Sequence, residues 1–203
     1  MKNLFKVSLL SIMLFIGANL SAQDTPFSFG LKAGVNLSNI GGDLGDDMDS
    51  KIGYNVGVTV DYAFTENWYL LTGLELTAKG AEFDKAGYKL DLNPLFLQLP
   101  IHAAYKFPIG ENLKIVVNAG PYVAYGLGGK FKIDDDGDKE EYEFFGREKK
   151  GIWNRFDFGI GLGGGPEISK FKVGIGYDFG LTNIANNGKI KTKNGYLTVG
   201  YRF

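Results

Sequence analysis

The single histidine of the chain, His102, is the one imidazole available for general acid–base chemistry. A general base needs a partner group within hydrogen-bond reach, and the sequence pattern places no serine firmly beside His102. His102 also falls in the middle of an expected strand, on the face that points away from the apolar side. We therefore favour a hydrogen-bonded structural histidine and predict that the protein is not an enzyme.

Two other motifs could bind a ligand. Residues 159–164 match a G-x-G-x-x-G pattern, but no helix pattern follows it, so we interpret these residues as strand glycines in a crowded interior. Residues 134–138 resemble a calcium loop, yet Lys139 stands where an EF-hand turn needs glycine. A solvated acidic loop is the favoured interpretation there and for residues 41–49. Divalent cations that bridge these acids to lipopolysaccharide phosphates remain an open alternative.

The candidate binding residues lie in the stretch 128–154, where aromatic side chains are flanked by an acidic and a basic run. Apolar anchors with a polar rim are typical of binding surfaces. The alternative is that these aromatics cap the end of the fold or extend two strands as a hairpin. The candidates are Tyr142, Phe144, Phe145, Arg147 and Trp153.

Composition limits the class of protein. The chain has 203 residues, enough for one domain, with 30 glycines and 14% aromatic residues, a pairing that suits many short strands. It has no cysteine, so disulfides are excluded, and with one histidine a thiolate or multi-histidine metal site is not expected. The net charge of -1 makes no case for nucleic acid as a partner, and no cofactor is predicted.

The N-terminal segment has the pattern of a signal peptide. Lys2 and Lys6 precede an apolar core at residues 7–16, and Ala22 is a small residue before the expected cut. We predict a cleaved signal peptide at residues 1–22 and an exported domain at residues 23–203. The alternative, an uncleaved anchor, is disfavoured because the core is short for a membrane span.

The elements that position these residues are strands with two unlike faces. In the last strand, Leu197, Val199, Tyr201 and Phe203 share one face and polar or small residues share the other. The same alternation recurs along the chain, over stretches longer than an average soluble strand. The predicted strands are residues 27–38, 52–64, 68–79, 95–107, 113–127, 155–163, 171–181 and 194–203.

The connections between these strands alternate in length. Residues 65–67, 108–112 and 169–170 are short turns, whereas residues 41–51, 80–93, 128–154 and 185–194 are long. Short periplasmic turns and longer outer loops are typical of membrane barrels. The fold class predicted is all-β: an eight-stranded antiparallel up-and-down transmembrane β-barrel, with a bulge expected at Pro100.

The interior of such a barrel holds side chains and little else. Buried charges are costly unless paired, so we predict an interlocked ion-pair plug, with inward glycines making space for long lysine and arginine chains. A soluble lipocalin-like barrel, apolar within and polar without, is the alternative fold. The inward charged and imidazole residues predicted are Lys32, Asp61, Glu75, His102, Lys106, Arg155, Asp157, Lys172, Asp178 and Arg202.

With these strands in place, the chain resembles the small outer-membrane β-barrel proteins of the porin-like, PorT-like type of Bacteroidota. The resemblance covers nearly all of residues 23–203 and depends on residues 30–38, 97–101, 120–122, 155–159 and 199–203. It implies a location in the outer membrane, with outer-membrane lipid and lipopolysaccharide as surroundings. The C-terminal Phe203 is similar to the signal read by the barrel-insertion machinery. The resemblance implies no mechanism.

The predicted function is that of a non-enzymatic barrel with a charge-plugged lumen, whose long outer loops bind an extracellular ligand or whose body supports the envelope. A small porin-like transport barrel is the first alternative. A lipid-modifying enzyme is the second, and it would place its His and Ser on the lipid-facing surface, where this sequence has none.

Overall fold

The computed structural model describes residues 26–42, 49–85, 88–135, 138–145, 154–184 and 190–203. The predicted signal peptide at residues 1–22 lies outside these residues, as do Arg147 and Trp153. Among the described residues, no helix is long and apolar enough to cross a membrane.

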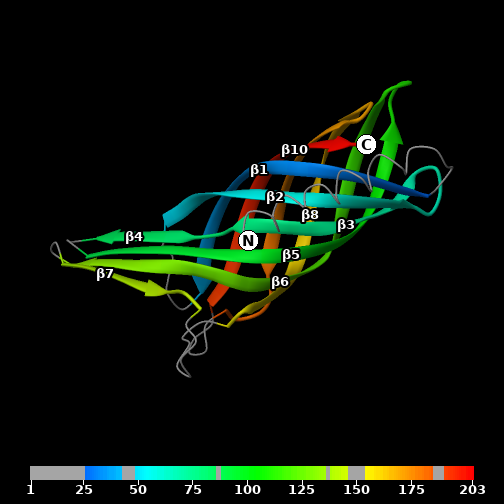
Figure 1. The fold of residues 1–203 in the computed structure, drawn as a ribbon. Helices are drawn as coiled ribbons and strands as arrows, with labels where there is room; N and C mark the ends of the chain where they lie inside the picture. The colour runs from blue at the N-terminus through cyan, green and yellow to red at the C-terminus, as the bar shows by residue number, and fades with distance from the viewer. Residues whose placement is uncertain (1–25, 43–48, 86–87, 136–137, 146–153, 185–189) are drawn as a thin grey trace, which may run out of the picture.

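The described chain folds into strands of one antiparallel sheet (Figure 1). The four longest are β1 (Phe27–Gly42), β2 (Asp49–Ala63), β5 (Tyr88–Pro108) and β6 (Leu113–Asp135). The others are β3 (Trp68–Ala78), β4 (Ala81–Lys85), β7 (Asp138–Glu143), β8 (Phe156–Ile168), β9 (Phe171–Gly180) and β10 (Ile190–Arg202).

The sheet closes on itself as a barrel-like ring. Pairing runs from β1 through β2, β3, β5, β6, β8, β9 and β10, and β10 pairs back with β1 from Gly30↔Arg202 to Gly42↔Ile190. The strand β4 pairs with β5 and with the start of β2, and β7 pairs with the end of β6. Figure 1 shows β4, β5, β6 and β7 projecting beyond the other strands, on the side away from the C-terminus.

The sequence predicted eight strands, and the structure describes ten because two of the predicted long loops contain strands. Residues 80–93 hold β4 and the start of β5, and residues 128–154 hold the end of β6 and β7. In these hairpins charged residues alternate with apolar ones, as in Glu82-Phe83-Asp84, whereas the barrel strands alternate apolar with mostly small or polar residues. The pattern of the barrel strands therefore does not predict these hairpins.

The predicted short turns are confirmed. Residues 64–67, 109–112 and 169–170 connect β2 to β3, β5 to β6 and β8 to β9, and we call this edge of the ring the short-turn end. The opposite edge, where β4 and β7 extend the sheet, is the projecting end.

The two faces of the ring have the polarity of a barrel in lipid. Outward side chains are apolar and exposed, as in the last strand, where Leu197, Val199 and Tyr201 are 51%, 61% and 40% exposed. Inward side chains include buried charges, with Asp157 at 0% and Lys106 at 1% exposure. This order is the reverse of a lipocalin-like barrel, so that alternative is wrong.

The expected bulge at Pro100 is also wrong. The register between β5 and β6 shifts at Leu95/Phe96, not at Pro100, which stays opposite Tyr122. Between β3 and β5 the ladder is interrupted from Thr72↔Ile101 to Glu75↔Gln98 without a change of register. Proline lacks an N–H, and here the missing bond is accommodated by this gap, across which the Thr72 hydroxyl donates to the Pro100 carbonyl at 2.7 Å.

Candidate functional site

The short-turn end of the lumen contains a charge cluster of Asp61, Glu167, Lys106, Lys172 and Arg202. The Lys106 Nζ lies 2.9 Å from Asp61 Oδ2 and 2.8 Å from Glu167 Oε2. Lys172 bonds Asp61 and lies 3.9 Å from Glu167, and Arg202 Nη1 lies 3.0 Å from Glu167 Oε1. Three cations thus share two carboxylates across strands that are far apart in the sequence, which is the ion-pair network that the inward charges predicted.

A second charged group lies deeper in the lumen, around Asp157. Its carboxylate accepts hydrogen bonds from Thr192 Oγ1 at 2.8 Å, Tyr122 OH at 3.2 Å and Thr182 Oγ1 at 3.2 Å. Lys79 Nζ lies 3.4 Å from the same carboxylate and 4.7 Å from the centre of the Tyr122 ring. The dry carboxylate therefore has a cation and three hydroxyl donors, as a buried charge requires.

Two residues of these networks were missing from the predicted inward charges. Glu167 lies on β8 beyond Gly163, where the sequence analysis had ended that strand. Lys79 was expected at the last position of its strand and was not counted as a lumen charge. A longer β8 would have been visible in the sequence as Pro166-Glu167-Ile168 placing one acid between two apolar neighbours.

At the projecting end the lumen contains an apolar cluster, which we call the apolar cap. Phe144 and Phe145 belong to it, at 1% and 5% exposure, and Phe145 meets Phe96 edge-on at 5.7 Å between ring centres. The predicted charge plug therefore gives way to apolar packing in this part of the lumen. The members are Ile40, Ala81, Leu92, Phe96, Tyr122, Ala124, Phe144, Phe145, Ile184 and Ile190.

The candidate binding residues are thus separated by the structure. Phe144 and Phe145 are buried in the apolar cap, which is the alternative arrangement considered for them, and they are not exposed anchors. Tyr142 remains 46% exposed on β7. Arg147 and Trp153 lie outside the described residues, so a binding role for the set stays a prediction.

Arg155 donates hydrogen bonds to backbone carbonyls beside the apolar cap. Contrary to expectation, it forms no ion pair among the described residues. Its guanidinium donates to the Gly126 carbonyl at 2.8 Å and to the Phe145 carbonyl at 2.7 Å. It also lies 5.2 Å from the centre of the Phe145 ring. Arg155 precedes β8 at the rim, where the neighbouring lumen is apolar and offers carbonyls in place of carboxylates.

We expect Arg155→Ala to loosen the segment that ends in Phe145. A hydrogen bond to a charged group contributes about 1.5–3 kcal/mol, so the free energy of local opening should fall by roughly that amount. Amide hydrogen exchange at Tyr142–Phe145 is the measurement, and it should accelerate about 10- to 100-fold. Arg155→Lys, which lacks the two-pronged donor, should give an intermediate rate. Unchanged exchange in both variants would show that packing alone holds the cap.

Glycines in and beside the sheet make room for neighbouring backbone, for rings and, at Gly41 and Gly80, for the Lys193 and Lys51 chains, so the expected role in accommodating lysines holds at few positions. A Cβ built on Gly126 would lie 2.2 Å from the Phe145 ring, and one on Gly176 would lie 2.3 Å from the Tyr196 hydroxyl. The residues 159–164 of the G-x-G-x-x-G pattern lie within β8, as predicted. Their spacing reflects packing in the lumen and not a phosphate loop.

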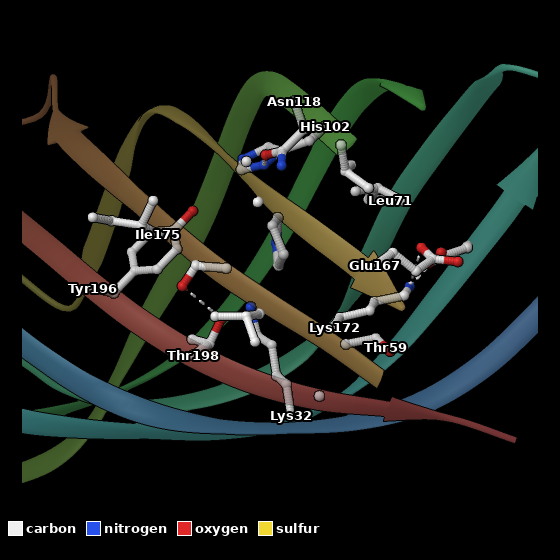
Figure 2. A pocket seen from close by; sticks show the side chains of 18 of the residues that line it. Lys32, Thr59, Leu71, His102, Asn118, Glu167, Lys172, Ile175, Tyr196 and Thr198 are labelled. Carbon is white, nitrogen blue, oxygen red and sulfur yellow. Dashed lines mark hydrogen bonds and ion pairs between the residues drawn. The ribbon is translucent and has the colours of Figure 1, made fainter. Parts of the chain in front are cut away.

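His102 is buried in the lumen beside a cavity of about 140 Å³ (Figure 2). Its Nδ1 lies 2.9 Å from Asn118 Oδ1, which confirms the structural hydrogen bond, while its Nε2 has no hydrogen-bond partner in the described structure. The cavity wall also carries Lys32, Lys172 and Tyr196. Among the described residues no group of three or more His, Cys, Asp or Glu could hold a metal ion.

The projecting end carries a different set of charges, exposed to solvent. Glu141 on β7 accepts from Lys130 and lies 3.5 Å from Lys132, both on β6. The hydrogen bond from Lys130 lowers the pKa of the Glu141 carboxyl, and the same bond raises the pKa of Lys130. At the base of the projection Lys51 is paired with Asp91 and with Glu82, at 3.3 Å for the second pair.

The class of protein follows from three observations: the strands form a ring, the ring is apolar outside and charged inside, and the sequence matches a known family. Residues 21–186 match the family described as the outer membrane protein beta-barrel domain, and the chain belongs to this family. Membership supports a location in the outer membrane. No curated protein sequence matches the chain significantly.

Solved structures of outer-membrane barrels resemble the chain at low identity. Ail, the attachment invasion locus protein of Yersinia pestis, is 19% identical over 87% of this chain and 98% of its own, with a TM-score of 0.45. Neisserial surface protein A is 15% identical over 86% and 97%, with a TM-score of 0.47. The outer membrane enzyme PagL is 14% identical over 85% and 98%, with a TM-score of 0.50, a likeness that concerns the fold alone.

Proposed function

We propose that the chain is a non-enzymatic integral protein of the outer membrane, of the porin-like, PorT-like type, whose projecting sheet binds a partner outside the cell. In this proposal the ring of eight long strands crosses the membrane, surrounded by outer-membrane lipid and lipopolysaccharide. The signal peptide at residues 1–22 directs export and is removed. Phe203, exposed on the outer face of the last strand, serves recognition by the barrel-insertion machinery.

The observation that carries the proposal is the length of β5 and β6. They have 21 and 23 residues, whereas a membrane-spanning strand needs about 9–11 residues. At ~3.3 Å per residue, roughly 33–40 Å of β5 and roughly 40–46 Å of β6 are left to extend beyond the membrane. The extended part is stiffened by β4 and β7 and bears charged side chains with Tyr142 among them, which suits a surface for protein or polysaccharide partners.

A closed lumen supports a binding role over a transport role. The charge cluster of Asp61, Glu167, Lys106, Lys172 and Arg202 occupies one end, and the apolar cap occupies the other. We expect the purified protein to pass negligible current in planar bilayers, measured beside a general porin as positive control. A large, steady single-channel current would contradict the closed lumen and favour the transport alternative.

The binding hypothesis is tested by removing the β6–β7 part of the projection while keeping β4, the start of β5 and the cap. Lys130 and Glu143 are paired across the base of the β6–β7 hairpin, so an Asn-Gly turn can replace residues 131–142 between them. We expect the shortened protein to remain heat-modifiable on gels and to stay in the outer membrane, because Phe144 and Phe145 are retained. Intact cells that carry the wild-type protein should capture the surface partner. Intact cells that carry the shortened protein should not.

The matched control is Glu111→Ala, a change in the turn between β5 and β6 at the short-turn end, which should bind as wild type does. Tyr142→Ala changes the predicted candidate that is exposed among the three that the structure describes, and it should weaken binding without affecting assembly. Unchanged binding by the shortened protein would move the function to another surface. Loss of a lipid-modification product in His102→Ala cells would revive the enzyme alternative.

A further inference from the structure

A small polar pocket of about 10 Å³ lies beside the larger luminal cavity. It is lined by side chains from six strands, among them Asn55 of β2, Gln98 of β5, Asp178 of β9 and Asn194 of β10. A volume of about 10–15 Å³ on this measure holds a single guest the size of a water molecule. We call it the amide pocket, and its wall also includes Thr77, Thr198, Tyr196 and the ion pair of Lys32 with Glu75.

Three oxygen atoms of the amide pocket have no hydrogen-bond partner. They are Asn55 Oδ1, Gln98 Oε1 and Asn194 Oδ1, on residues that are 5%, 4% and 2% exposed. Leaving a buried acceptor unsatisfied is costly, and most native structures avoid it. These three acceptors come from three different strands and line one small pocket. They indicate a guest that brings positive charge or several hydrogen-bond donors.

The amide orientations follow from the neighbouring groups. Asn36 Nδ2 donates to Thr77 Oγ1 at 2.8 Å and to the Ala78 carbonyl at 3.3 Å, so Asn36 Oδ1 must accept, and it does so from Asn55 Nδ2. Gln98 Nε2 at 3.1 Å and Asn194 Nδ2 at 3.5 Å both face the Asp178 carboxylate, which accepts only. All three free atoms are therefore carbonyl oxygens.

Asp178 adds a negative charge that no lysine or arginine balances among the described residues. It is 2% exposed and bonded by two neutral amides, whereas Asp61, Glu75, Asp157 and Glu167 each have a cationic partner. The nearest cation at the pocket wall, Lys32, is bound to Glu75 at 2.6 Å. An isolated buried carboxylate is strongly unfavourable, so compensation from outside the described side chains is expected.

We propose that the amide pocket binds one monovalent metal cation. The ligands are the three carboxamide oxygens and the Asp178 carboxylate, a set of hard oxygen donors with one negative charge. Calcium sites usually carry several carboxylates and six to eight ligands, and magnesium keeps several waters, so the single charge and small volume favour a monovalent ion. The competing source of charge is an imidazolium at His102, because a Cβ built on Gly161 would lie within 3 Å of both His102 Nε2 and Asp178 Oδ1.

The first test is the dependence of stability on the cation. Detergent-folded protein is unfolded in sodium chloride and in N-methylglucamine chloride at equal ionic strength. At sodium one hundred times its Kd, the ratio of folded to unfolded protein should be about 100-fold higher than in N-methylglucamine, and the free energy of unfolding should keep rising with the logarithm of the sodium concentration. Asp178→Asn should lose this dependence and be at least as stable as wild type without sodium.

Asp157→Asn is the matched control, since Asp157 is equally buried but has Lys79 as its partner. It should lower stability in both salts while keeping the sodium dependence. Equal stability of the wild type in the two salts would overturn the proposal and favour the imidazolium at His102 or a water molecule. Stabilisation by calcium chloride but not by sodium chloride would overturn the monovalent assignment.

The second test needs no variant and decides the matter even if Asp178→Asn fails to fold. Wild-type crystals are grown with rubidium or thallium(I) in place of sodium, and anomalous scattering locates the ion. A peak in contact with Gln98 Oε1, Asn194 Oδ1 and Asp178 supports the site. Density for water alone in the pocket, or an anomalous peak only at surface carboxylates, overturns it.

Discussion

Replacing Asp61 by asparagine should lower the free energy of unfolding by about 3–5 kcal/mol, the usual cost of breaking a buried ion pair from one side. The variant would leave Lys106, Lys172 and Arg202 with Glu167 as their one remaining carboxylate. Urea unfolding in lipid vesicles is the measurement. Water from the adjoining cavity of about 140 Å³, which Asp61 also lines, would reduce the loss.

A double-mutant cycle separates the ion pair from its surroundings. Lys106→Met in the Asp61→Asn background removes the surplus cation, so part of the lost stability should return, with a coupling free energy of about 1–3 kcal/mol. Glu141→Gln is the surface control, because it breaks an equally close pair with Lys130 in water and should leave stability unchanged within error. Additive effects of the Asp61 and Lys106 changes would contradict a shared network.

Phe96→Ala should cost about 3–5 kcal/mol, the range for deleting a buried phenylalanine ring and leaving a cavity. Phe96 is fully buried and is in contact with the Phe145 ring, and Lys79 Nζ lies 5.5 Å from its centre. The same urea experiment measures the loss. Amide exchange at Phe144 and Phe145 should also accelerate, because their packing surface is removed.

Tyr142→Ala is the control for this second result, since Tyr142 is exposed on β7 and lies two residues before the cap. It should not change the free energy of unfolding measurably. A loss below 1 kcal/mol for Phe96→Ala would indicate that the cap collapses around the missing ring. In that case Arg155, and not aromatic packing, holds Phe145 in place.

The amino-acid sequence by itself determined the two faces of the eight strands that it predicted. Alternation with period two depends only on local backbone geometry, so Leu197, Val199 and Tyr201 could be assigned to the outer face without knowledge of any partner strand. The short turns and the inward position of Lys106 and Asp157 followed in the same way. The extension of β5 and β6 was within reach of the same argument, had charged residues been allowed on both faces above the membrane.

The tertiary structure decided which inward side chains meet. Alternation with period two places Asp61, Lys106 and Lys172 on the inner face, but their contact depends on the stagger of strands around the ring and on the reach of each side chain. The same geometry leaves Asp178 with amides in place of a cation. It also folds Phe144 and Phe145 over the open end of the ring, because an apolar side chain next to an unfilled lumen is buried more favourably there than in water.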